Sequence, residues 1–508
     1  MSRTNKFITS VKFGFVNQAA MSLGGLALTP YYLRFLGEGQ YGLWLMSSSI
    51  LGYLSMLDFG VMAMVPREIA IARGRELAGR SRGESASTAV WGIGLLQLPL
   101  VLLACFVCHV SFLRGKDDGG LAFLLAAYGA LFPFRVFNAV LVGRQDYRFV
   151  GYLTLGQWVV TSAVSAILVV VQPGLFALSL GWAAGQVVRV VASALRLWSR
   201  YRIDFPILFR LPQLRVVREW LSRSTWVTLG NVAFMLRMGS DLLVIGYVVG
   251  AEAVVAYSCT VKLAQFVSLV PQQLLTSARS GLFELIGLND AERLRRVSLA
   301  IEQAVLLSAT FVASLSMAVN EPFVRMWVGP AQYSGGAVSL FAAAHVVARH
   351  YALGVNAVAF ALGHEKVLGI AAVVDGCVTL VFMVVSIRLV GVAGAAAAPL
   401  VGVCLIQIPV ALRLANRGLR RSTRAWLQSV LPWCVRAGAV FLLSIAIALA
   451  GLSWELVALL TVLLVGVSVA LFVPLIASSH MRTYVPAPIA RLLGALEKLS
   501  LADGTPRT

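Results

Sequence analysis

The sequence contains few charged residues for its length. Asp, Glu, Lys and Arg make up 13% of the 508 residues, and 59% are hydrophobic, whereas about 25% of an average soluble chain is charged. No connection between the hydrophobic stretches is long enough to form a separate soluble domain. This composition excludes an ordinary soluble protein and indicates a chain that lies mostly within a membrane.

Two further absences narrow the chemistry. The sequence has no P-loop motif, so we do not expect this chain to hydrolyse ATP. Its six cysteines all lie in hydrophobic stretches and show no pairing pattern. Cys105, Cys108 and His109 fit the C-x-x-C-H pattern of haem attachment, but they close a hydrophobic stretch, so we interpret them as helix residues. We therefore expect no catalytic centre, metal site or cofactor.

Hydrophobic stretches of about 20 residues recur along the chain, and this is the length that a helix needs to cross a bilayer. Each must be helical, because lipid cannot satisfy free backbone N–H and C=O groups. The pattern predicts an all-α polytopic membrane protein with about 14 transmembrane helices. The predicted spans are residues 11–33, 41–64, 88–110, 120–143, 149–171, 174–197, 222–248, 252–278, 297–319, 335–362, 366–388, 391–412, 429–450 and 454–477.

A net charge of +20 is compatible with a nucleic-acid partner, but the basic residues are concentrated in every second connection. The opposite connections contain only Arg34, Arg114, Lys116, Arg325 and Arg388. This is the positive-inside pattern, and it predicts that both termini are cytoplasmic. The basic segment 3–12 leads into a full-length span without a cleavage site, so we expect it to remain as an anchor. The charge thus reflects topology, and we expect no nucleic-acid partner.

An internal repeat relates two halves of the chain. Asn17 and Gly37 recur as Asn231 and Gly250, and the Asn-Ala-Val segment at Asn138 recurs at Asn356. Such duplication is typical of secondary transporters, which build a midplane site between two lobes. We therefore expect two six-helix lobes around a central cavity.

The repeat and the charge pattern together predict five parts. Residues 1–198 and 222–413 are the two lobes, and 199–221 is a cytoplasmic interfacial linker. Residues 414–477 are an appended helix pair, and 478–508 are a cytoplasmic amphipathic tail.

Several charged residues remain deep in the predicted spans, where each costs on the order of 3 kcal/mol. Arg237 and Asp241 are four residues apart, so they either neutralise each other or contact a ligand. Lys262, Arg135 and Arg349 have no acidic residue within one helical turn. An aqueous cavity or a ligand is the expected compensation for such charges.

The remaining deep residues leave alternatives open. Asp58 either pairs across the bundle or carries a coupling proton, and we assign Asp241 and Asp375 to coupling or charge pairing. Arg436 can reach the cytoplasmic edge, and His345 and His350 are interpreted as packing residues. Asn17, Gln18, Asn231 and Asn356 are expected to line the polar cavity.

The basic residues outnumber the acidic ones in this predicted interior. A positive, hydrated passage fits an anionic cargo, and arginine binds a diphosphate through forked hydrogen bonds. We therefore expect Arg237, Lys262, Arg349 and Arg135 to bind a diphosphate headgroup.

Five segments near the start of the chain form a recognisable set: residues 14–17 (GFVN), 28–37 (LTPYYLRFLG), 41–44 (YGLW), 57–60 (LDFG) and 137–143 (FNAVLVG). They resemble Wzx-type polysaccharide flippases of the multidrug/oligosaccharidyl-lipid/polysaccharide exporter superfamily. The resemblance implies a multi-pass protein of the bacterial inner membrane that moves a polyprenyl-diphosphate-linked oligosaccharide by alternating access. Spans 1 and 2 lack the deep basic residues of the related lipid II flippases, which argues against lipid II as cargo.

The expected function is therefore translocation of a lipid-linked glycan for O-antigen, capsule or exopolysaccharide assembly. Coupling to a proton or sodium gradient is compatible with the sequence. The expected partners are this glycan and membrane lipids, with room for other polysaccharide-assembly membrane proteins.

Three other functions remain in view. A drug/cation antiporter of the same superfamily would favour a more acidic or aromatic cavity. A membrane polymerase or ligase would need catalytic carboxylates in a sizeable loop, but the largest predicted outer loop, residues 320–334, holds only Glu321. A non-catalytic scaffold would leave the buried charges unexplained.

Overall fold

Helices are the regular elements of the part of the chain that the structure describes, which agrees with the all-α prediction. The computed structural model describes residues 3–58, 65–66, 69, 98–99, 101–106, 119–201, 230, 232–233, 235–236, 239–287 and 290–479. The predicted linker 199–221 and tail 478–508 lie almost wholly outside these residues. Both therefore stay predictions.

The chain divides into two compact units, residues 1–255 and 256–508. The described helices of the first unit are α1 (Arg3–Leu54), η1 (Ser55–Asp58), α4 (Gly120–Leu131), η2 (Phe132–Phe134), α5 (Arg135–Gly143), α6 (Tyr147–Val171), α7 (Leu175–Arg200) and α9 (Ser240–Val248). Helix α10 (Ala251–Val267) begins in the first unit and continues into the second.

The second unit continues with α11 (Leu269–Gly287), α12 (Ala291–Trp327), η3 (Pro330–Gln332), α13 (Gly336–Ala361), α14 (Glu365–Val390), α15 (Val392–Gly402), η4 (Val403–Gln407), α16 (Ile408–Gly418), α17 (Thr423–Leu449) and α18 (Trp454–Ser478). Element η4 is a single π-helical turn between α15 and α16.

Ten segments of the described chain are long and apolar enough to cross a membrane, and each coincides with a predicted span. They begin at Gly120 with α4 and end at Ala477 in α18. Helix α1 covers much of the first two predicted spans, and its backbone leaves the helical region at Gly37 (φ 72°, ψ 174°), between them. The predicted span 88–110 falls largely outside the described residues, and 222–248 is described only in part, so the total of 14 stays a prediction.

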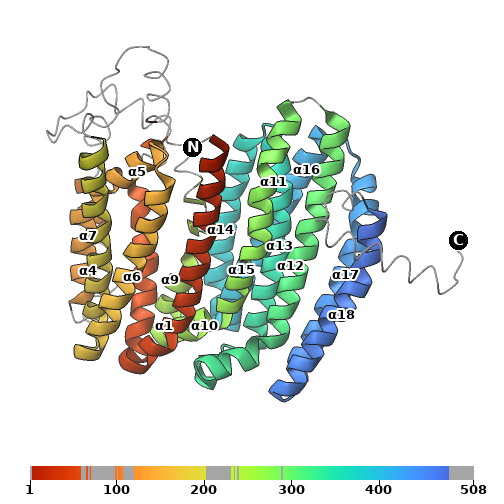
Figure 1. Ribbon diagram of the computed structural model, residues 1–508. Coiled ribbons are helices and arrows are strands. Elements are labelled where there is room, and N and C mark those ends of the chain that lie inside the picture. The colour runs from red at the N-terminus through yellow and green to blue at the C-terminus, as the bar shows by residue number, and fades with distance from the viewer. Residues whose placement is uncertain are drawn as a thin grey trace, which may run out of the picture. The chain divides into compact units, whose positions relative to one another are not determined.

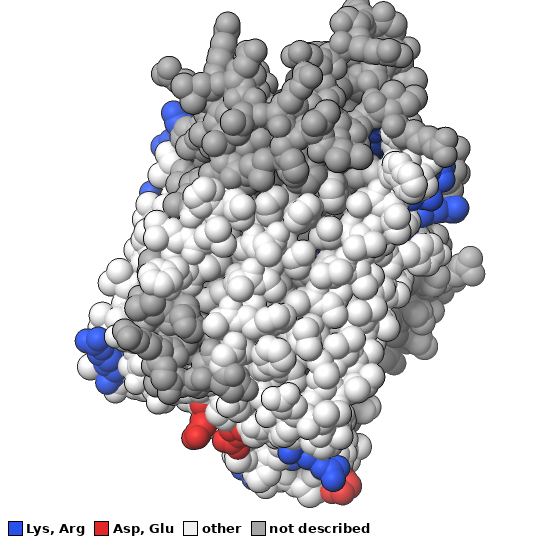
Figure 2. All heavy atoms as spheres, turned by 90° about the vertical axis from the view of Figure 1, so that its left-hand side faces the viewer, with Lys and Arg blue, Asp and Glu red and all other residues white. Residues whose placement is uncertain are grey.

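Figure 2 looks onto the side of the molecule where α4 and α7 lie. A broad band of uncharged side chains crosses this face, and the visible Lys, Arg, Asp and Glu lie along its margins (Figure 2). An uncharged band bordered by charge is the surface expected of helices that span a bilayer.

The predicted outer loop 320–334 is longer than the one observed, because α12 continues to Trp327. Its last turns contain the ion pair between Arg325 Nη2 and Glu321 Oε1 at 2.7 Å. These residues are four apart, the spacing at which opposite charges support a helix. Residues 320–327 are therefore helical, and the connection before α13 is shorter than predicted.

In the first unit, α7 packs along α6 and α4, and α1 packs along α6 and α9 (Figure 1). Small residues permit the close contact of α6 and α7: a Cβ atom at Gly185 would overlap the side chain of Thr161. Polar contacts add to this packing, since Tyr31 of α1 donates a hydrogen bond to the Ala166 carbonyl of α6 at 2.8 Å.

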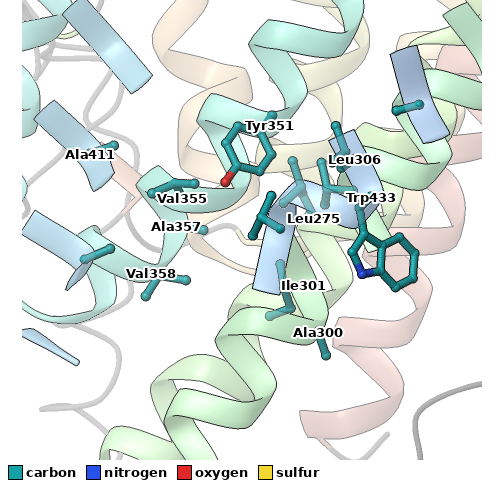
Figure 3. Packing of buried hydrophobic residues seen from close by; sticks show 14 of the residues in the cluster. Leu275, Ala300, Ile301, Leu306, Tyr351, Val355, Ala357, Val358, Ala411 and Trp433 are labelled. Carbon is teal, nitrogen blue, oxygen red and sulfur yellow. The ribbon is translucent and has the colours of Figure 1, made fainter. Parts of the chain in front are cut away.

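In the second unit, α12 is the central helix and packs against α11, α13, α17 and α18. Its core is a cluster of apolar side chains from these helices and α16. Figure 3 shows Trp433 of α17 close to Leu306 of α12, with Tyr351 and Val355 of α13 nearby. Trp433 is only 2% exposed, so α17 is anchored to this unit by a large buried aromatic residue.

The internal repeat is visible in the backbone. One shift along the chain maps α5, α6 and α7 onto the end of α13, α14 and α15–α16, with the helix ends agreeing within two residues. Helices α5 and α13 even end alike. In α5, Asp146 N–H bonds to the Leu141 carbonyl and Gln145 N–H to that of Val142; in α13, His364 N–H bonds to the Ala359 carbonyl and Gly363 N–H to that of Phe360. This is the Schellman pattern, with Gln145 (φ 60°) and Gly363 (φ 86°) in the left-handed region.

Candidate functional site

Arg135 and Arg189 lie together in the interior of the first unit. Arg135 begins α5, directly after the short η2 turn that contains Pro133, and Arg189 lies in the middle of α7. Arg135 Nη1 donates to the Tyr128 hydroxyl at 3.3 Å, and its guanidinium lies 5.3 Å from the centre of the Phe132 ring. Arg189 Nη1 donates to Gln157 Oε1 of α6 at 3.1 Å.

Tyr128, which accepts the hydrogen bond from Arg135, stacks on Trp182 of α7 with the ring centres 6.1 Å apart, and Arg189 lies about two turns beyond Trp182 on the same helix. Both arginine side chains are half-buried. Among the described residues, Arg189 has no carboxylate partner, and the neutral amide of Gln157 is its hydrogen-bond acceptor. The site therefore combines two neighbouring positive charges with neutral polar groups, an arrangement that an anion would stabilise.

Asn138 lies one turn beyond Arg135 on the same face of α5. Its Oδ1 atom is buried and has no hydrogen-bond partner in the part of the chain that the structure describes. A buried acceptor without a partner costs about 1–3 kcal/mol. This residue therefore adds an unused polar group to the same region.

Lys262 lies on α10 in the second unit and is half-buried. The nearby Thr260 accepts hydrogen bonds through both its carbonyl and its hydroxyl group. Asn320 Nδ2 donates to the Thr260 carbonyl at 2.8 Å, and Ser334 N–H donates to Thr260 Oγ1 at 2.8 Å. Lys262 itself has no hydrogen-bond or ion-pair partner among the described residues. It is thus a cation inside a candidate span without a neutralising group in that set.

Arg349 lies on α13 next to His350 and is half-buried. His350 is only 3% exposed, and its Nδ1 lies 2.8 Å from the Val346 carbonyl one turn earlier. This bond ties the imidazole to its own helix, as the packing interpretation predicts. His345 also lies on α13 and is half-buried.

Asp375 lies on α14 and is completely buried. Thr379 Oγ1 donates to Asp375 Oδ1 at 3.4 Å, and a Cβ atom at Gly402 would overlap this carboxylate. On the neighbouring α13, Asn356 Nδ2 donates to Gln407 Oε1 at 2.9 Å. The π-helical turn η4 carries Gln407 to this position, and such turns are frequent at functional sites.

The other predicted site residues are dispersed or lie outside the described set. Asp241 is in the first turn of α9, where its Oδ1 accepts from Leu242 N–H at 2.9 Å. Asn17 is buried and donates to the Gly151 carbonyl at 2.9 Å, a contact between α1 and α6, whereas Gln18 is exposed. Arg237 and Asn231 lie outside the described residues. Asp58 ends η1, and its side chain is not among those described.

Residues 15–283 of the chain match the family described as polysaccharide biosynthesis protein. The match covers more than half of the sequence. The chain belongs to this family.

A curated relative is the uncharacterized membrane protein EpsK of Bacillus subtilis (strain 168), which is 25% identical over 337 residues. The aligned part covers 60% of this chain and 61% of EpsK, so the chain spans less than two thirds of that relative.

Solved structures share the fold at low sequence identity. The lipid II flippase MurJ in an inward closed conformation aligns with a TM-score of 0.62 and 13% identity, covering 92% of this chain and 100% of that one. An inward-facing multidrug resistance MATE transporter aligns with a TM-score of 0.57 and 14% identity, covering 80% and 99%. A point mutant of the Vibrio cholerae MATE transporter VcmN aligns with a TM-score of 0.53 and 14% identity, covering 84% of this chain and 98% of that one. The chain therefore shares its fold with solved membrane transporters, at low sequence identity.

Two features of this family member are absent from the sequence-based set. The first is Arg189, which lies about two turns inside the predicted span 174–197. This depth in the span could have identified Arg189 from the sequence. The other is the ion pair between Glu302 Oε1 and Arg421 Nη2 at 2.9 Å, whose side chains are 0% and 5% exposed. Glu302 could have been identified from the sequence, because it is an acidic residue inside the predicted span 297–319.

A polar network surrounds this ion pair. Trp426 Nε1 donates to Glu302 Oε2 at 3.1 Å and lies 3.2 Å from the Tyr351 hydroxyl. Arg421 Nε donates to Asn416 Oδ1 at 2.7 Å. The network joins α12, α13 and the start of α17, so it anchors the appended helices to the second unit rather than presenting a free charge.

A second polar cluster lies where α5, α6 and α7 end or begin. Asp146 precedes α6, and its Oδ2 accepts from Arg196 Nε at 2.9 Å and from the Tyr201 hydroxyl at 3.3 Å. Burial raises the pKa of Tyr201, and the negative charge of Asp146 raises it further. The phenol therefore stays protonated and donates to Asp146. This cluster joins the start of α6 to the end of α7.

Proposed function

We propose that this chain is a flippase that moves a polyprenyl-diphosphate-linked oligosaccharide across the bacterial inner membrane for surface polysaccharide assembly. Membership of the polysaccharide biosynthesis family and the transporter fold support this proposal. The observation that carries it is Lys262, a cation in a candidate span with no carboxylate partner among the described residues.

The physical argument concerns the cost of charge in a membrane. A lone cation deep in a span costs on the order of 3 kcal/mol, so its retention requires a compensating role. A diphosphate faces the same barrier in hydrocarbon, and a hydrated basic passage lowers the cost for both. In this proposal the sugars occupy water and the polyprenyl tail remains in lipid.

The proposed headgroup contacts are Arg237, Lys262, Arg349 and Arg135. Asp58, Asp241 and Asp375 are the proposed groups for charge pairing or for coupling to a proton or sodium gradient. Asn17, Gln18, Asn231 and Asn356 are proposed to line the polar path. Both termini are proposed to lie in the cytoplasm, from the distribution of Lys and Arg.

The decisive experiment is genetic. Deletion of the gene should abolish a surface polysaccharide and cause its lipid-linked repeat unit to accumulate in the cytoplasmic leaflet. Accumulation in the outer leaflet would instead indicate a polymerase or ligase and would contradict the proposal.

A Lys262→Met variant tests the residue that carries the argument. Loss of one charge-assisted hydrogen bond is worth about 1.5–3 kcal/mol, so glycan transport should slow by about tenfold or more. Lys262→Arg should retain more activity because it keeps the charge. Lys366→Met is the matched control, since Lys366 is exposed at the start of α14. Equal transport by the Lys262→Met variant and the wild type would exclude Lys262 from the headgroup site.

Multidrug export is a second candidate, and the similarity to MATE structures favours it. A cationic drug would be repelled by Lys262 in the second unit, and also by Arg135 and Arg189 in the first unit. A dye-efflux assay in cells distinguishes the two functions. If dye efflux is lost when the gene is deleted but is unchanged in the Lys262→Met variant, the chain exports a drug that does not bind at Lys262. That result would favour multidrug export.

A further inference from the structure

We infer that Arg135 and Arg189 form a phosphoryl-binding site built by the first unit alone, for the diphosphate of the cargo. The inference rests on the proposed function and deepens it, because it adds Arg189 as a headgroup ligand and pairs it with Arg135. Three observations carry it: the geometry of the two guanidinium groups, the comparison with the repeated half, and the neutral character of the group that positions Arg189.

The geometry places both arginines at a similar depth. Helices α4–α5 and α7 correspond to spans that run in the same direction, and Arg135 and Arg189 lie at similar distances from the starts of these spans, Gly120 and Leu175. Tyr128 of α4 stacks on Trp182 of α7 with the ring centres 6.1 Å apart, and Arg135 and Arg189 each follow one of these rings by about two helical turns. Both side chains are half-buried. Arg189 uses one Nη1 atom in its hydrogen bond to Gln157, and an arginine carries five N–H donors, so this side chain can offer further donors to an oxyanion.

The second unit shows that the fold does not require cations at these positions. The shift that maps Asn138 onto Asn356 maps Arg135 onto Leu353 and Arg189 onto Gln407. Asn356 and Gln407 satisfy each other with a hydrogen bond at 2.9 Å. A neutral pair therefore suffices for helix packing in this part of the repeat. The two arginines are an electrostatic specialisation of the first unit.

The same shift maps Gln157 onto Asp375. The position that holds Arg189 by a hydrogen bond in the first unit is thus a buried carboxylate in the second. A carboxylate at residue 157 would neutralise Arg189, whereas the amide orients this side chain and leaves its charge available. Gln157 is therefore a positioning residue, and its neutrality preserves the anion site.

The chemistry selects a phosphorylated ligand. Two guanidinium groups can each form forked hydrogen bonds, which suits a diphosphate with oxygens on two phosphorus atoms. The buried Oδ1 of Asn138, which has no partner, can accept a hydrogen bond from a ligand hydroxyl. We therefore expect the site to prefer a diphosphate to a monophosphate.

The test measures binding to the full chain in nanodiscs of phosphatidylcholine, which carries no net charge. The probes are farnesyl diphosphate, farnesyl monophosphate and inorganic pyrophosphate, so that a lipid headgroup and a free diphosphate can be distinguished. The variants are Arg189→Gln and Gln157→Glu. The second keeps an acceptor for Arg189 and resembles the natural Asp375, so it should fold even if the first does not. The control is Arg148→Gln, which removes an exposed arginine at the start of α6.

The expected result is that Arg189→Gln and Gln157→Glu each weaken farnesyl diphosphate binding at least tenfold, while Arg148→Gln leaves it unchanged. If Arg189 had a purely structural role, Gln157→Glu would leave farnesyl diphosphate binding unchanged. The new ion pair would then only strengthen the contact between α6 and α7.

Wild-type affinity in both folded variants would overturn this inference. The flippase proposal would then still stand, since it depends on the deletion phenotype and on Lys262. Equal affinity of the wild type for monophosphate and diphosphate would also refute the two-arginine clamp. Tight pyrophosphate binding that is lost in both variants would support the site as one for diphosphates in general.

Discussion

Replacement of Glu302 by Gln should destabilise the protein far more than the same change at an exposed acidic residue. Glu302 is 0% exposed and Arg421 is 5% exposed, and their atoms are 2.9 Å apart. The substitution preserves the size of the side chain and its ability to hydrogen bond with Trp426. It removes the negative charge and leaves the buried guanidinium of Arg421, which already has an unsatisfied Nη1 atom, without a counterion.

The expected magnitude follows from burial. Removal of one member of a buried ion pair costs about 3–5 kcal/mol, because the remaining charge is desolvated without compensation. Glu292 and Arg295 provide the matched control: their atoms are 3.4 Å apart, and their side chains are 61% and 52% exposed. An exposed pair contributes about 0–1 kcal/mol. The two substitutions should therefore differ by at least about 2 kcal/mol.

The assay is denaturant titration of the purified protein in mixed micelles, for Glu302→Gln, Glu292→Gln and the double variant Glu302→Gln/Arg421→Gln. The double variant should recover much of the lost free energy of unfolding, because no unpaired charge remains. The reasoning would be refuted if Glu302→Gln cost no more than Glu292→Gln. It would also be refuted if the double variant were as unstable as the sum of the single ones.

Two further predictions concern the backbone of the repeat. Gly185→Val should lower the free energy of unfolding by about 1–3 kcal/mol, since a side chain there overlaps Thr161. The same titration should show partial recovery when Thr161→Ala is added. An unchanged free energy of unfolding in the single variant would contradict the contact. Gln145→Gly should stabilise the protein by about 1 kcal/mol, because Gln145 adopts φ 60° where the repeated half has Gly363. The reverse exchange, Gly363→Gln, should destabilise it, and an unchanged midpoint in both would refute this explanation.

Hydrophobic runs predicted the helices well, because length and composition decide whether a segment can cross a bilayer. Each of the ten candidate spans coincides with a predicted one. Helix ends were less accurate. The span ending at 319 continues to Trp327, since its last turns carry a helix-supporting ion pair that a hydropathy profile treats as polar loop.

The site was only partly predictable for a physical reason. A hydrophobic run treats a basic residue near its end as an edge residue, so Arg189 was not selected; α7 continues to Arg200, which places Arg189 in the middle of the helix. Contacts between distant residues were also beyond reach. Glu302 and Arg421 are 119 residues apart in sequence, and the sequence pattern reveals neither their contact nor their burial.

The turn η4 has a consequence for how this duplicated chain can change. Gly185, which contacts Thr161, and Gly402, which contacts Asp375, hold corresponding places in the two halves. The segment from Gly402 to Gln407 is one residue longer than the segment from Gly185 to Arg189. The wider π-helical turn η4 lies over this extra residue, and such a turn takes up one additional residue within an α-helix. A span of this fold can thus hold one residue more without rotating the rest of the helix. Deletion of one residue from 403–407 should accordingly restore a regular helix rather than disrupt the unit.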